Sequence, residues 1–287
     1  MKKLKNPKIS VIMSVYNGMP LGPQSTNWRT RTASSAYLED AVKSILGQTY
    51  KNFEFIVVDD ASTDNSWKYL TGIKDKRLIL IQNKKNLGLA VSLNKAIKAS
   101  DGEYIARMDA DDISYPDRLK IQLAYLTKNK KVELCGSWAT LINEDGKKIG
   151  ANRKNPLNDR KIKNLLGIYP TIIHSTFFAK KDFFTNSGGY RKKFDGAEEY
   201  DLLCRAKYHF QYANIPRELI SWRLNNDRRS IKMMDKMYAL DIKIKKENLK
   251  RDGPNIYNVY GYLKMVMVNF LVPLPIKIKI ARLLKLA

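Results

Sequence analysis

Hydrophobic and polar positions follow two alternating patterns along the first half of the chain. Short runs of β-branched and aromatic residues are typical of strands buried on both faces, and they cover residues 8–15, 53–58, 78–81 and 104–108. Apolar residues at helical spacing follow these runs, in residues 37–48, 67–70, 88–99 and a segment that begins at Pro116. This alternation predicts an α/β fold with a Rossmann-like, mostly parallel sheet flanked by helices.

The pattern changes in the second half of the chain. Three further runs predict strands: residues 134–143, 175–179 and 218–223. After them the sequence becomes helical, amphipathic and rich in lysine, with breaks at Pro273 and Pro275. We therefore expect an α/β domain over residues 1–228 and a basic helical extension over residues 229–287.

One segment differs in composition from its surroundings. Residues 19–36 lie between the first predicted strand and its helix, contain two arginines and no lysine, and have few large aliphatic side chains. Loops of this length inside a compact domain are unusual and are often functional or disordered. The segment is therefore either a lid or an inserted piece, and the sequence favours neither.

Composition excludes several classes of protein. With 44% hydrophobic residues, the chain can bury a full core, which excludes general disorder. Its two cysteines, Cys135 and Cys204, are not spaced as CxxC, which argues against a disulfide scaffold or a structural zinc site; we expect both to be buried. The sequence shows neither a signal-peptide core nor an apolar stretch of about 18 residues, so we expect a cytoplasmic protein.

The net charge of +24 suggests an anionic partner: nucleic acid, an anionic membrane surface or phosphorylated small molecules. Basic residues interleaved with aromatic ones, which nucleic-acid binding favours, are not found. Residues 241–287 hold ten Lys/Arg and three Asp/Glu among apolar residues. This pattern predicts helices that lie on an anionic membrane surface. The alternative is that the helices pack on the α/β domain and turn a solvated face outward.

Carboxylates follow two of the predicted strands. Asp109, Asp111 and Asp112 come directly after one strand, where they can coordinate a hard divalent cation or supply the acidic first turn of the next helix. Asp59 and Asp60 end another strand, where a carboxylate can accept a hydrogen bond from a base or a ribose, or simply form a capped turn. In parallel sheets both strand ends lie at the ligand-binding edge.

Together these segments resemble the inverting family 2 glycosyltransferases, which have the GT-A fold. The similar blocks occur in the order of the family and cover most of residues 8–225: Ile9–Gly18, Ser44–Tyr50, Phe53–Asp64, Asn86–Gly88, Gly102–Asp112, Pro116–Leu119, Gly188–Tyr190 and Ala197–Leu202.

The resemblance implies a nucleotide-diphosphate sugar donor (we favour a UDP-sugar), a divalent cation (Mn²⁺ or Mg²⁺), and transfer with inversion. It implies the following roles by motif: Tyr16 and Asp60 as nucleobase contacts, Asp59 as their support, Asn86, Gly88 and Asp109 as further nucleotide-sugar contacts, and Asp111 with Asp112 as metal ligands.

The general base should come from the segment that begins at Glu198. The family usually has Glu-Asp where this chain has Glu198-Glu199, so Glu199 takes the position of the base with a side chain one methylene longer. Asp201 is the alternative base. Acidic residues in the first turn of a helix also stabilise the helix. We expect at least one of Glu198, Glu199 and Asp201 to have that structural role.

The acceptor side is less defined. His174, Trp138 and Glu198 are weak candidates for acceptor contacts, and the histidine and tryptophan are equally readable as structural residues. We expect a single sugar to be added to a saccharide or lipid-linked acceptor at the inner face of the plasma membrane, in polysaccharide assembly. The alternatives are a catalytically inactive nucleotide-sugar-binding protein and a nucleotidyltransferase, although the first strand lacks the Gly-rich phosphate loop that the latter would need.

Overall fold

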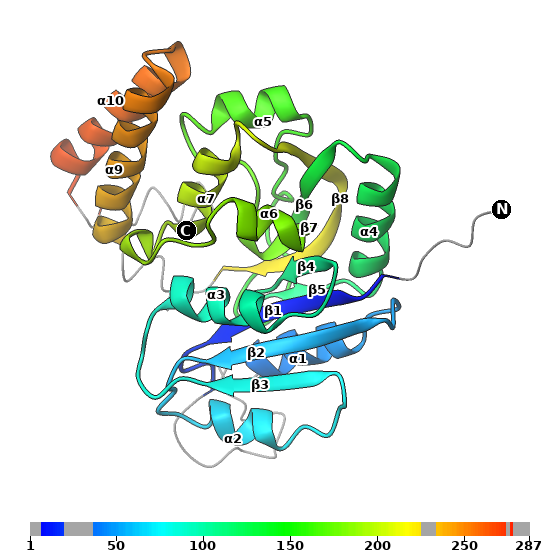
Figure 1. Ribbon diagram of the computed structural model, residues 1–287. Coiled ribbons are helices and arrows are strands. Elements are labelled where there is room, and N and C mark those ends of the chain that lie inside the picture. The colour runs from blue at the N-terminus through cyan, green and yellow to red at the C-terminus, as the bar shows by residue number, and fades with distance from the viewer. Residues whose placement is uncertain (1–6, 20–36, 225–233, 274–275, 278–287) are drawn as a thin grey trace.

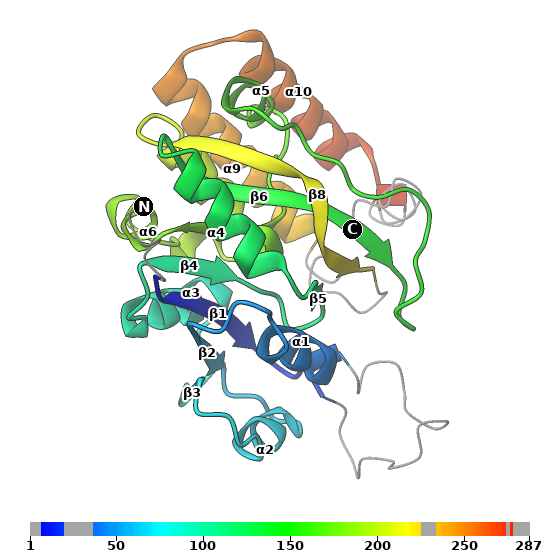
Figure 2. The same ribbon diagram turned by 90° about the vertical axis from the view of Figure 1, so that its right-hand side faces the viewer.

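One curved, eight-stranded sheet forms the centre of the molecule, with helices on both faces (Figures 1 and 2). The computed structural model describes residues 7–19, 37–224, 234–273 and 276–277. The strands are β1 (Ile9–Val15), β2 (Phe53–Asp59), β3 (Leu78–Gln82), β4 (Tyr104–Arg107), β5 (Ile113–Ser114), β6 (Val132–Ile142), β7 (Phe178–Lys180) and β8 (Gln211–Arg223).

The α-helices are α1 (Tyr37–Leu46), α2 (Ser66–Thr71), α3 (Leu89–Ala99), α4 (Arg118–Lys128), α5 (Asp159–Leu165), α6 (Lys181–Asn186), α7 (Glu198–Ala206), α9 (Met234–Asp252) and α10 (Ile256–Leu271). Two 3₁₀ turns, η2 (His174–Thr176) and η3 (Lys192–Phe194), connect the later elements. Of the atypical segment 19–36, all but Met19 lies outside the described residues, so its role stays open.

The strand order is β3-β2-β1-β4-β7-β6-β8-β5. The first four strands are parallel, as the sequence predicts, and Val15 pairs with Asp59 while Ile12 pairs with Arg107. The carboxyl ends of β1, β2 and β4 therefore share one edge of the sheet. Beyond β4 the sheet is mixed, because β7 runs antiparallel to both of its neighbours and β5 runs antiparallel to β8.

The strand predicted at residues 175–179 differs from the observed structure. Residues 174–176 form η2 instead, and the strand begins only at Phe178. Hydroxyl hydrogen bonds account for the difference. Thr176 Oγ1 donates locally to the carbonyl of Ile173 (2.7 Å), and Ser175 Oγ donates to the carboxylate of Asp109, which is distant in sequence. Short hydroxyl side chains compete in this way with strand pairing.

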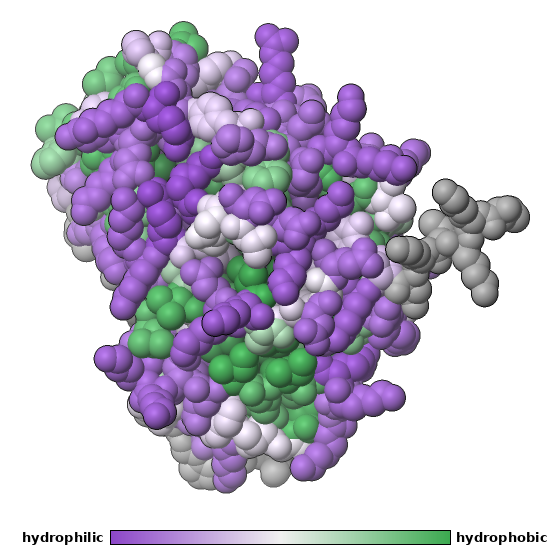
Figure 3. Space-filling view, in the orientation of Figure 1, coloured by the Kyte–Doolittle hydropathy of each residue, from purple (hydrophilic) through white to green (hydrophobic). Residues whose placement is uncertain are grey.

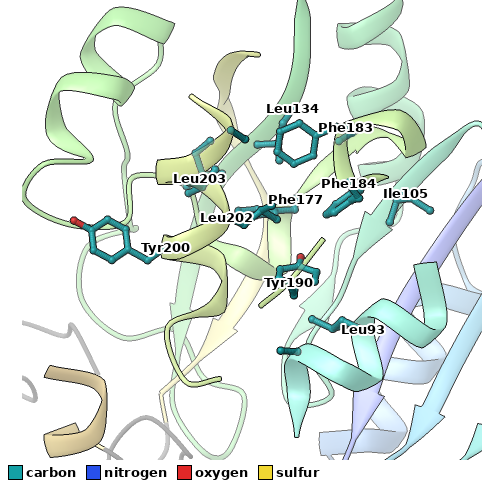
Figure 4. Close-up of a cluster of buried hydrophobic side chains, with 14 of the residues drawn as sticks. Leu93, Ile105, Leu134, Phe177, Phe183, Phe184, Tyr190, Tyr200, Leu202 and Leu203 are labelled. Carbon is teal, nitrogen blue, oxygen red and sulfur yellow. The ribbon is translucent and has the colours of Figure 1, made fainter. Parts of the chain in front are cut away.

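Two hydrophobic layers cover the two faces of the sheet. Because side chains alternate along a strand, Ile12 joins one layer while Val11 and Met13 join the other. The first layer is filled by α3, α6, α7 and the strands beneath them, with Leu93 and Phe177 among its members (Figure 4). The second lies under α1, α2 and α4.

The C-terminal helices α9 and α10 form a hairpin beside α7 (Figure 1). Leu240 and Ile244 of α9 join the first hydrophobic layer. The helix α10 approaches the segment after α5 so closely that a Cβ on Gly261 would lie 1.9 Å from the carbonyl oxygen of Gly167. None of the helices in the described residues is long and apolar enough to cross a membrane.

Both cysteines are buried and unpaired, as expected. Burial raises the pKa of both thiols, to about 11 at Cys204 and further still at Cys135. The thiols are therefore protonated at neutral pH and act as small apolar core residues.

Replacing Gly261 with alanine should loosen α10, because the added methyl group cannot fit against Gly167. We expect the backbone amides of α10 to exchange with deuterium at least about tenfold faster in Gly261→Ala than in the wild type. Lys264→Ala, on the exposed side of the same helix, is the control and should leave exchange unchanged. Equal protection in all three proteins would contradict this packing.

Candidate active site

The turn after β1 is tied to the turn after β2 at the ligand-binding edge of the sheet. Asn17 has a left-handed φ of 52°, and its side-chain oxygen accepts a hydrogen bond from the Thr63 amide (2.8 Å). The Met19 amide donates to Asp64 Oδ2 (2.7 Å). These bonds fix the start of the atypical segment and leave Tyr16 52% exposed, where its ring is open for stacking.

Asp59 and Asp60 are both buried at the end of β2. The Asp60 carboxylate accepts hydrogen bonds from the amides of Leu87 (2.9 Å) and Gly88 (2.8 Å) and from Asn83 Nδ2 (2.7 Å). Asp59 Oδ1, by contrast, has no hydrogen-bond partner among the described residues. Asp60 therefore holds the next loop in place, and Asp59 retains a buried acceptor without a donor, which is rare in folded proteins.

The loop held by Asp60 also needs a glycine. Gly88 has φ 93°, and a Cβ there would lie 2.8 Å from Asp195 Oδ2. The other oxygen of Asp195 accepts from the Ala90 amide (3.0 Å) at the start of α3. Asn86 lies exposed on the same loop. The predicted donor contacts Tyr16, Asn86 and Gly88 thus come from adjacent turns at one edge of the sheet.

Arg107, the last residue of β4, determines the charge state of Asp109. Its guanidinium is 1% exposed and forms an ion pair with Asp109, which also accepts from Ser175 Oγ (2.8 Å). Burial alone would raise the pKa of Asp109, but Arg107, His174 and Ser175 together outweigh it and lower the pKa to about 2. Asp109 is therefore ionised at neutral pH.

Two more buried arginines support the same segment. Arg118 Nη2 donates to the carbonyl of Arg107 (2.6 Å), and burial together with the charge of Arg107 lowers the pKa of Arg118 to about 9. Arg223, at the end of β8, donates from Nε to the carbonyl of Asp111 (2.9 Å) and from its amide to Asp112 Oδ1 (2.9 Å). Three fully buried guanidinium groups thus surround residues 107–112.

The three aspartates form a group that fits a divalent cation. One carboxylate oxygen from each of Asp109, Asp111 and Asp112 lies within 4.8 Å of the others. Asp112 is fully buried and accepts from the Ser175 hydroxyl, whereas Asp111 is only half-buried. Carboxylate oxygens are the ligands that Mg²⁺ and Mn²⁺ prefer, so the donor set fits the predicted metal.

A second acidic group lies on the other side of η2. His174 Nδ1 is 4.0 Å from Glu198 Oε1 and 3.9 Å from Glu199 Oε2, at the start of α7. The Nε2 atom of His174 is 2.9 Å from the hydroxyl of Tyr190. Since Ser175 contacts the aspartates, two consecutive residues of η2 connect the two acidic groups. His174, Glu198 and Glu199 also lie close enough to one another to share a cation.

Glu199 and Glu198 differ in their surroundings. Burial and the neighbouring Glu198 raise the pKa of Glu199 to about 8, while the weaker influence of Arg107 opposes them. A carboxyl group with this pKa becomes a stronger base once it has lost its proton. Glu198 Oε2 accepts from the Gly196 amide (2.6 Å), a bond that closes the first turn of α7.

Asp201, the alternative base, is engaged in ion pairs. It is 1% exposed and accepts from Arg191 Nε (3.0 Å) and from Arg205 Nε (3.0 Å). Arg191 also pairs with Glu247 of α9 (2.9 Å). The carboxylate of Asp201 thus connects α7 to its neighbours.

Trp138 lies on β6 at a separate hollow. Its indole Nε1 donates to the carbonyl of Asn155 (3.1 Å), and Lys154 Nζ lies 5.0 Å from the ring centre. Lys154 and Asn155 also line a cavity of about 390 Å³, together with Lys161 and Tyr169. Because its ring contacts two residues that line this basic cavity, Trp138 remains a candidate for contact with the acceptor.

Sequence reasoning missed Arg107, Ser175 and Arg223. Each had a signal: Arg107 is a charged residue inside an otherwise apolar strand, Ser175 adjoins His174, and Arg223 ends a predicted strand. A buried charge needs a partner, so an arginine next to an acidic run was a reason to expect an ion pair. The partners of Ser175 and Arg223 are 63 and 111 residues away in sequence, and local patterns do not reveal them.

Comparison with known proteins shows which family the chain resembles. Residues 10–192 match the sequence profile of Glycosyl transferase family 2. An uncharacterized glycosyltransferase of Haemophilus influenzae is 31% identical over 253 residues, which cover 85% of this chain and 73% of that protein. The O-antigen biosynthesis glycosyltransferase WbnJ of Escherichia coli is 32% identical over 197 residues, which cover 66% of this chain and 75% of that protein.

Solved structures share the fold at low sequence identity. S. aureus TarS in complex with UDP-GlcNAc aligns with a TM-score of 0.67 and 16% identity, over 92% of this chain and 73% of that chain. The mannosyltransferase PcManGT from Pyrobaculum calidifontis, in complex with GDP-Man and Mn²⁺, aligns with a TM-score of 0.61 and 18% identity, over 96% of this chain and 73% of that chain. The likeness confirms the predicted GT-A fold.

The matched profile spans β1 to α6 and so includes the acidic edge of the sheet and the η2 residues that contact it. From this match and the 31% identical relative, we conclude that the chain belongs to glycosyl transferase family 2, as its motifs indicated.

Proposed function

We propose that the protein transfers a single sugar from a nucleotide-diphosphate sugar, for which we favour a UDP-sugar, to a hydroxyl group of a saccharide or lipid-linked acceptor, with inversion. One observation carries this proposal: His174 and Ser175 hold the aspartates of residues 109–112 and the glutamates of α7 on either side of a single turn. A site with separate acids for the leaving group and for the acceptor has what an inverting transfer requires.

The sheet edge supports binding of the nucleotide. Tyr16 offers an exposed ring for stacking on the base, and a buried oxygen of Asp59 receives no hydrogen bond from the described part of the chain. Asp60 holds the loop of Asn86 and Gly88 beside them. TarS, which has the same fold, is known in complex with UDP-GlcNAc, and this supports a UDP-sugar as the donor.

Asp111, with Asp109 and Asp112, would hold a Mn²⁺ or Mg²⁺ ion. When bound, such a cation stabilises negative charge on a departing diphosphate. The protein contributes by fixing two of the carboxylates, since Arg107 and Ser175 hold Asp109 while Ser175 and Arg223 hold Asp112. Mn²⁺ in the complex of PcManGT with GDP-Man supports this assignment.

Glu199 is the proposed general base. Its carboxylate would take the proton of the acceptor hydroxyl as the acceptor oxygen bonds to the anomeric carbon and the bond from that carbon to the diphosphate breaks. Attack from the side opposite the leaving group inverts the configuration. The two ion pairs of Asp201 support Glu199 over Asp201 as the base.

We further propose that the reaction belongs to cell-surface polysaccharide assembly at the inner face of the plasma membrane. The name of WbnJ, an O-antigen biosynthesis glycosyltransferase, supports this assignment. His174, Glu198 and Trp138 would contact the acceptor, because the first two adjoin the proposed base and the third borders a basic hollow. Residues 1–228 would form the catalytic domain and residues 229–287 the extension.

Asp111→Asn should abolish metal-dependent transfer, because an amide is a poorer ligand for a hard cation than a carboxylate. In a screen of nucleotide sugars with Mn²⁺ or Mg²⁺, scored by nucleotide release, we expect a loss of at least about a hundredfold. Asp101→Asn changes an exposed acid on another loop and serves as the control. Metal-dependent release at the wild-type rate by Asp111→Asn would rule out this ligand.

Glu199→Gln should lower kcat by about 10²- to 10⁴-fold and leave donor affinity near the wild-type value, because the amide cannot accept the proton. Asp201→Asn should instead lower the melting temperature, since it removes the charge partner of Arg205 and one of the two charge partners of Arg191. Steady-state kinetics and thermal unfolding of both variants test the assignment. Normal turnover in Glu199→Gln, with turnover lost in a folded Asp201→Asn, would reverse it.

The stability of the metal-free protein should also depend on Glu199. Its pKa rises from an ordinary value of 4.5 to about 8 on folding, so the folded state binds more protons between these pH values. The free energy of unfolding should therefore fall as the pH rises from about 5 to about 8. Glu199→Gln should flatten that fall in urea titrations with EDTA. Parallel pH profiles for both proteins would show that Glu199 does not titrate in this range.

A further inference from the structure

The helix α10 presents an apolar face to solvent. Seven large apolar side chains on it are between 36% and 78% exposed: Ile256, Val259, Tyr260, Leu263, Met267, Phe270 and Leu271. Their spacing of three and four residues places them on one side of the helix. Apolar colouring covers this part of the hairpin at the upper left of Figure 3. Contiguous apolar surface of this kind marks a contact site for a protein or a membrane.

The opposite side of α10 is fixed to the rest of the protein. Asn258 and Gly261 are buried there, and the close approach of Gly261 to Gly167 leaves no room for a side chain. The helix also has a well-formed start, because the side chain of Asn255 accepts from the amides of Tyr257 (3.1 Å) and Asn258 (3.0 Å). The apolar face is therefore held in one orientation relative to the catalytic domain.

We propose that this face of α10 lies in the surface of an anionic lipid bilayer. Lys264 is the single charged residue of the helix and is exposed beside this face. Residues 253–287 contain five basic residues and no acidic one; of these, Lys277 is buried and pairs with Asp235. Basic residues beside an apolar helical face are the pattern of helices that lie in the membrane interface. Sixteen residues give a helix about 24 Å long, enough to lie along the surface as one anchor. The proposal identifies which surface of the protein would contact the membrane, and it rests on the membrane location given under Proposed function.

Charge favours a bilayer over a second copy of this chain. Two such faces in contact would bring together surfaces of a protein whose net charge is +24, and like charges oppose association. Anionic headgroups instead attract each nearby basic residue. An anionic bilayer accommodates both the apolar face of α10 and its lysine. The apolar side chains would enter the acyl boundary while Lys264 remains among the headgroups.

Vesicle sedimentation tests the inference on the full chain. Wild type, Leu263→Ser/Phe270→Ser and the control Ile79→Ser/Tyr208→Ser would be mixed with phosphatidylglycerol–phosphatidylcholine vesicles and with pure phosphatidylcholine vesicles. The control removes two apolar side chains of 38% and 50% exposure elsewhere on the surface. We expect the wild type and the control to bind the anionic vesicles, and the α10 variant to bind them at least about tenfold more weakly. Binding to pure phosphatidylcholine should be weaker for all three proteins.

Two results would overturn the inference. One is equal binding of the α10 variant and the wild type to anionic vesicles, provided that circular dichroism shows both to be folded. The other is a wild-type dimer in sedimentation velocity that the α10 substitutions dissociate, which would make the face a contact between copies. Nucleotide release in a vesicle-free assay reports the proposed chemistry separately, because neither substitution touches the acidic site.

Discussion

The pairing of buried guanidinium groups with the acidic segment after β4 is the constraint on which the site depends. Arg107, Arg118 and Arg223 are fully buried. The guanidinium of Arg107 pairs with the Asp109 carboxylate, whereas those of Arg118 and Arg223 donate to the main-chain carbonyls of Arg107 and Asp111. Burying an unpaired charge costs several kcal/mol, so Arg107 and Asp109 have to fold together. The acidic cluster, which would otherwise repel itself, thereby has a defined shape before any cation or substrate arrives.

Sheet topology makes this pairing possible. Arg107 ends a parallel strand in the first half of the sheet, whereas Arg223 ends β8 in the second half, and the antiparallel strand β7 joins the halves. Directly before β7, η2 places Ser175 against the aspartates and His174 against the glutamates of α7. Both residues belong to one turn, so the aspartates and the glutamates contact neighbouring residues of the same short segment. We infer that the distance between leaving group and base is set by this turn.

Local sequence patterns predicted the strands that carry the site better than the long-range polar contacts that connect its residues. The apolar runs before Asp59 and Asp109 located the strands and therefore the ligand-binding edge, since strand ends follow from periodicity alone. The same reasoning predicted a strand from residue 175, where η2 lies instead and the hydroxyl of Ser175 bonds to aspartates more than 60 residues away. Arg107 was passed over although a charge inside an apolar strand indicates a buried partner, because periodicity alone assigns no role to such a residue. Long-range pairing of polar groups depends on the tertiary structure, which sequence periodicity does not contain.

The charge of Arg107 organises the acids for transfer, and the kinetics of substitutions at this position test its role directly. We would compare nucleotide-sugar turnover by Arg107→Lys and Arg107→Met, with the fold of each checked by circular dichroism. We expect the methionine variant to lose at least about a hundredfold in kcat, and lysine, which keeps the charge but not the planar geometry, to recover part of that loss. A folded Arg107→Met protein with wild-type kcat would show that the charge of Arg107 does not organise the acids.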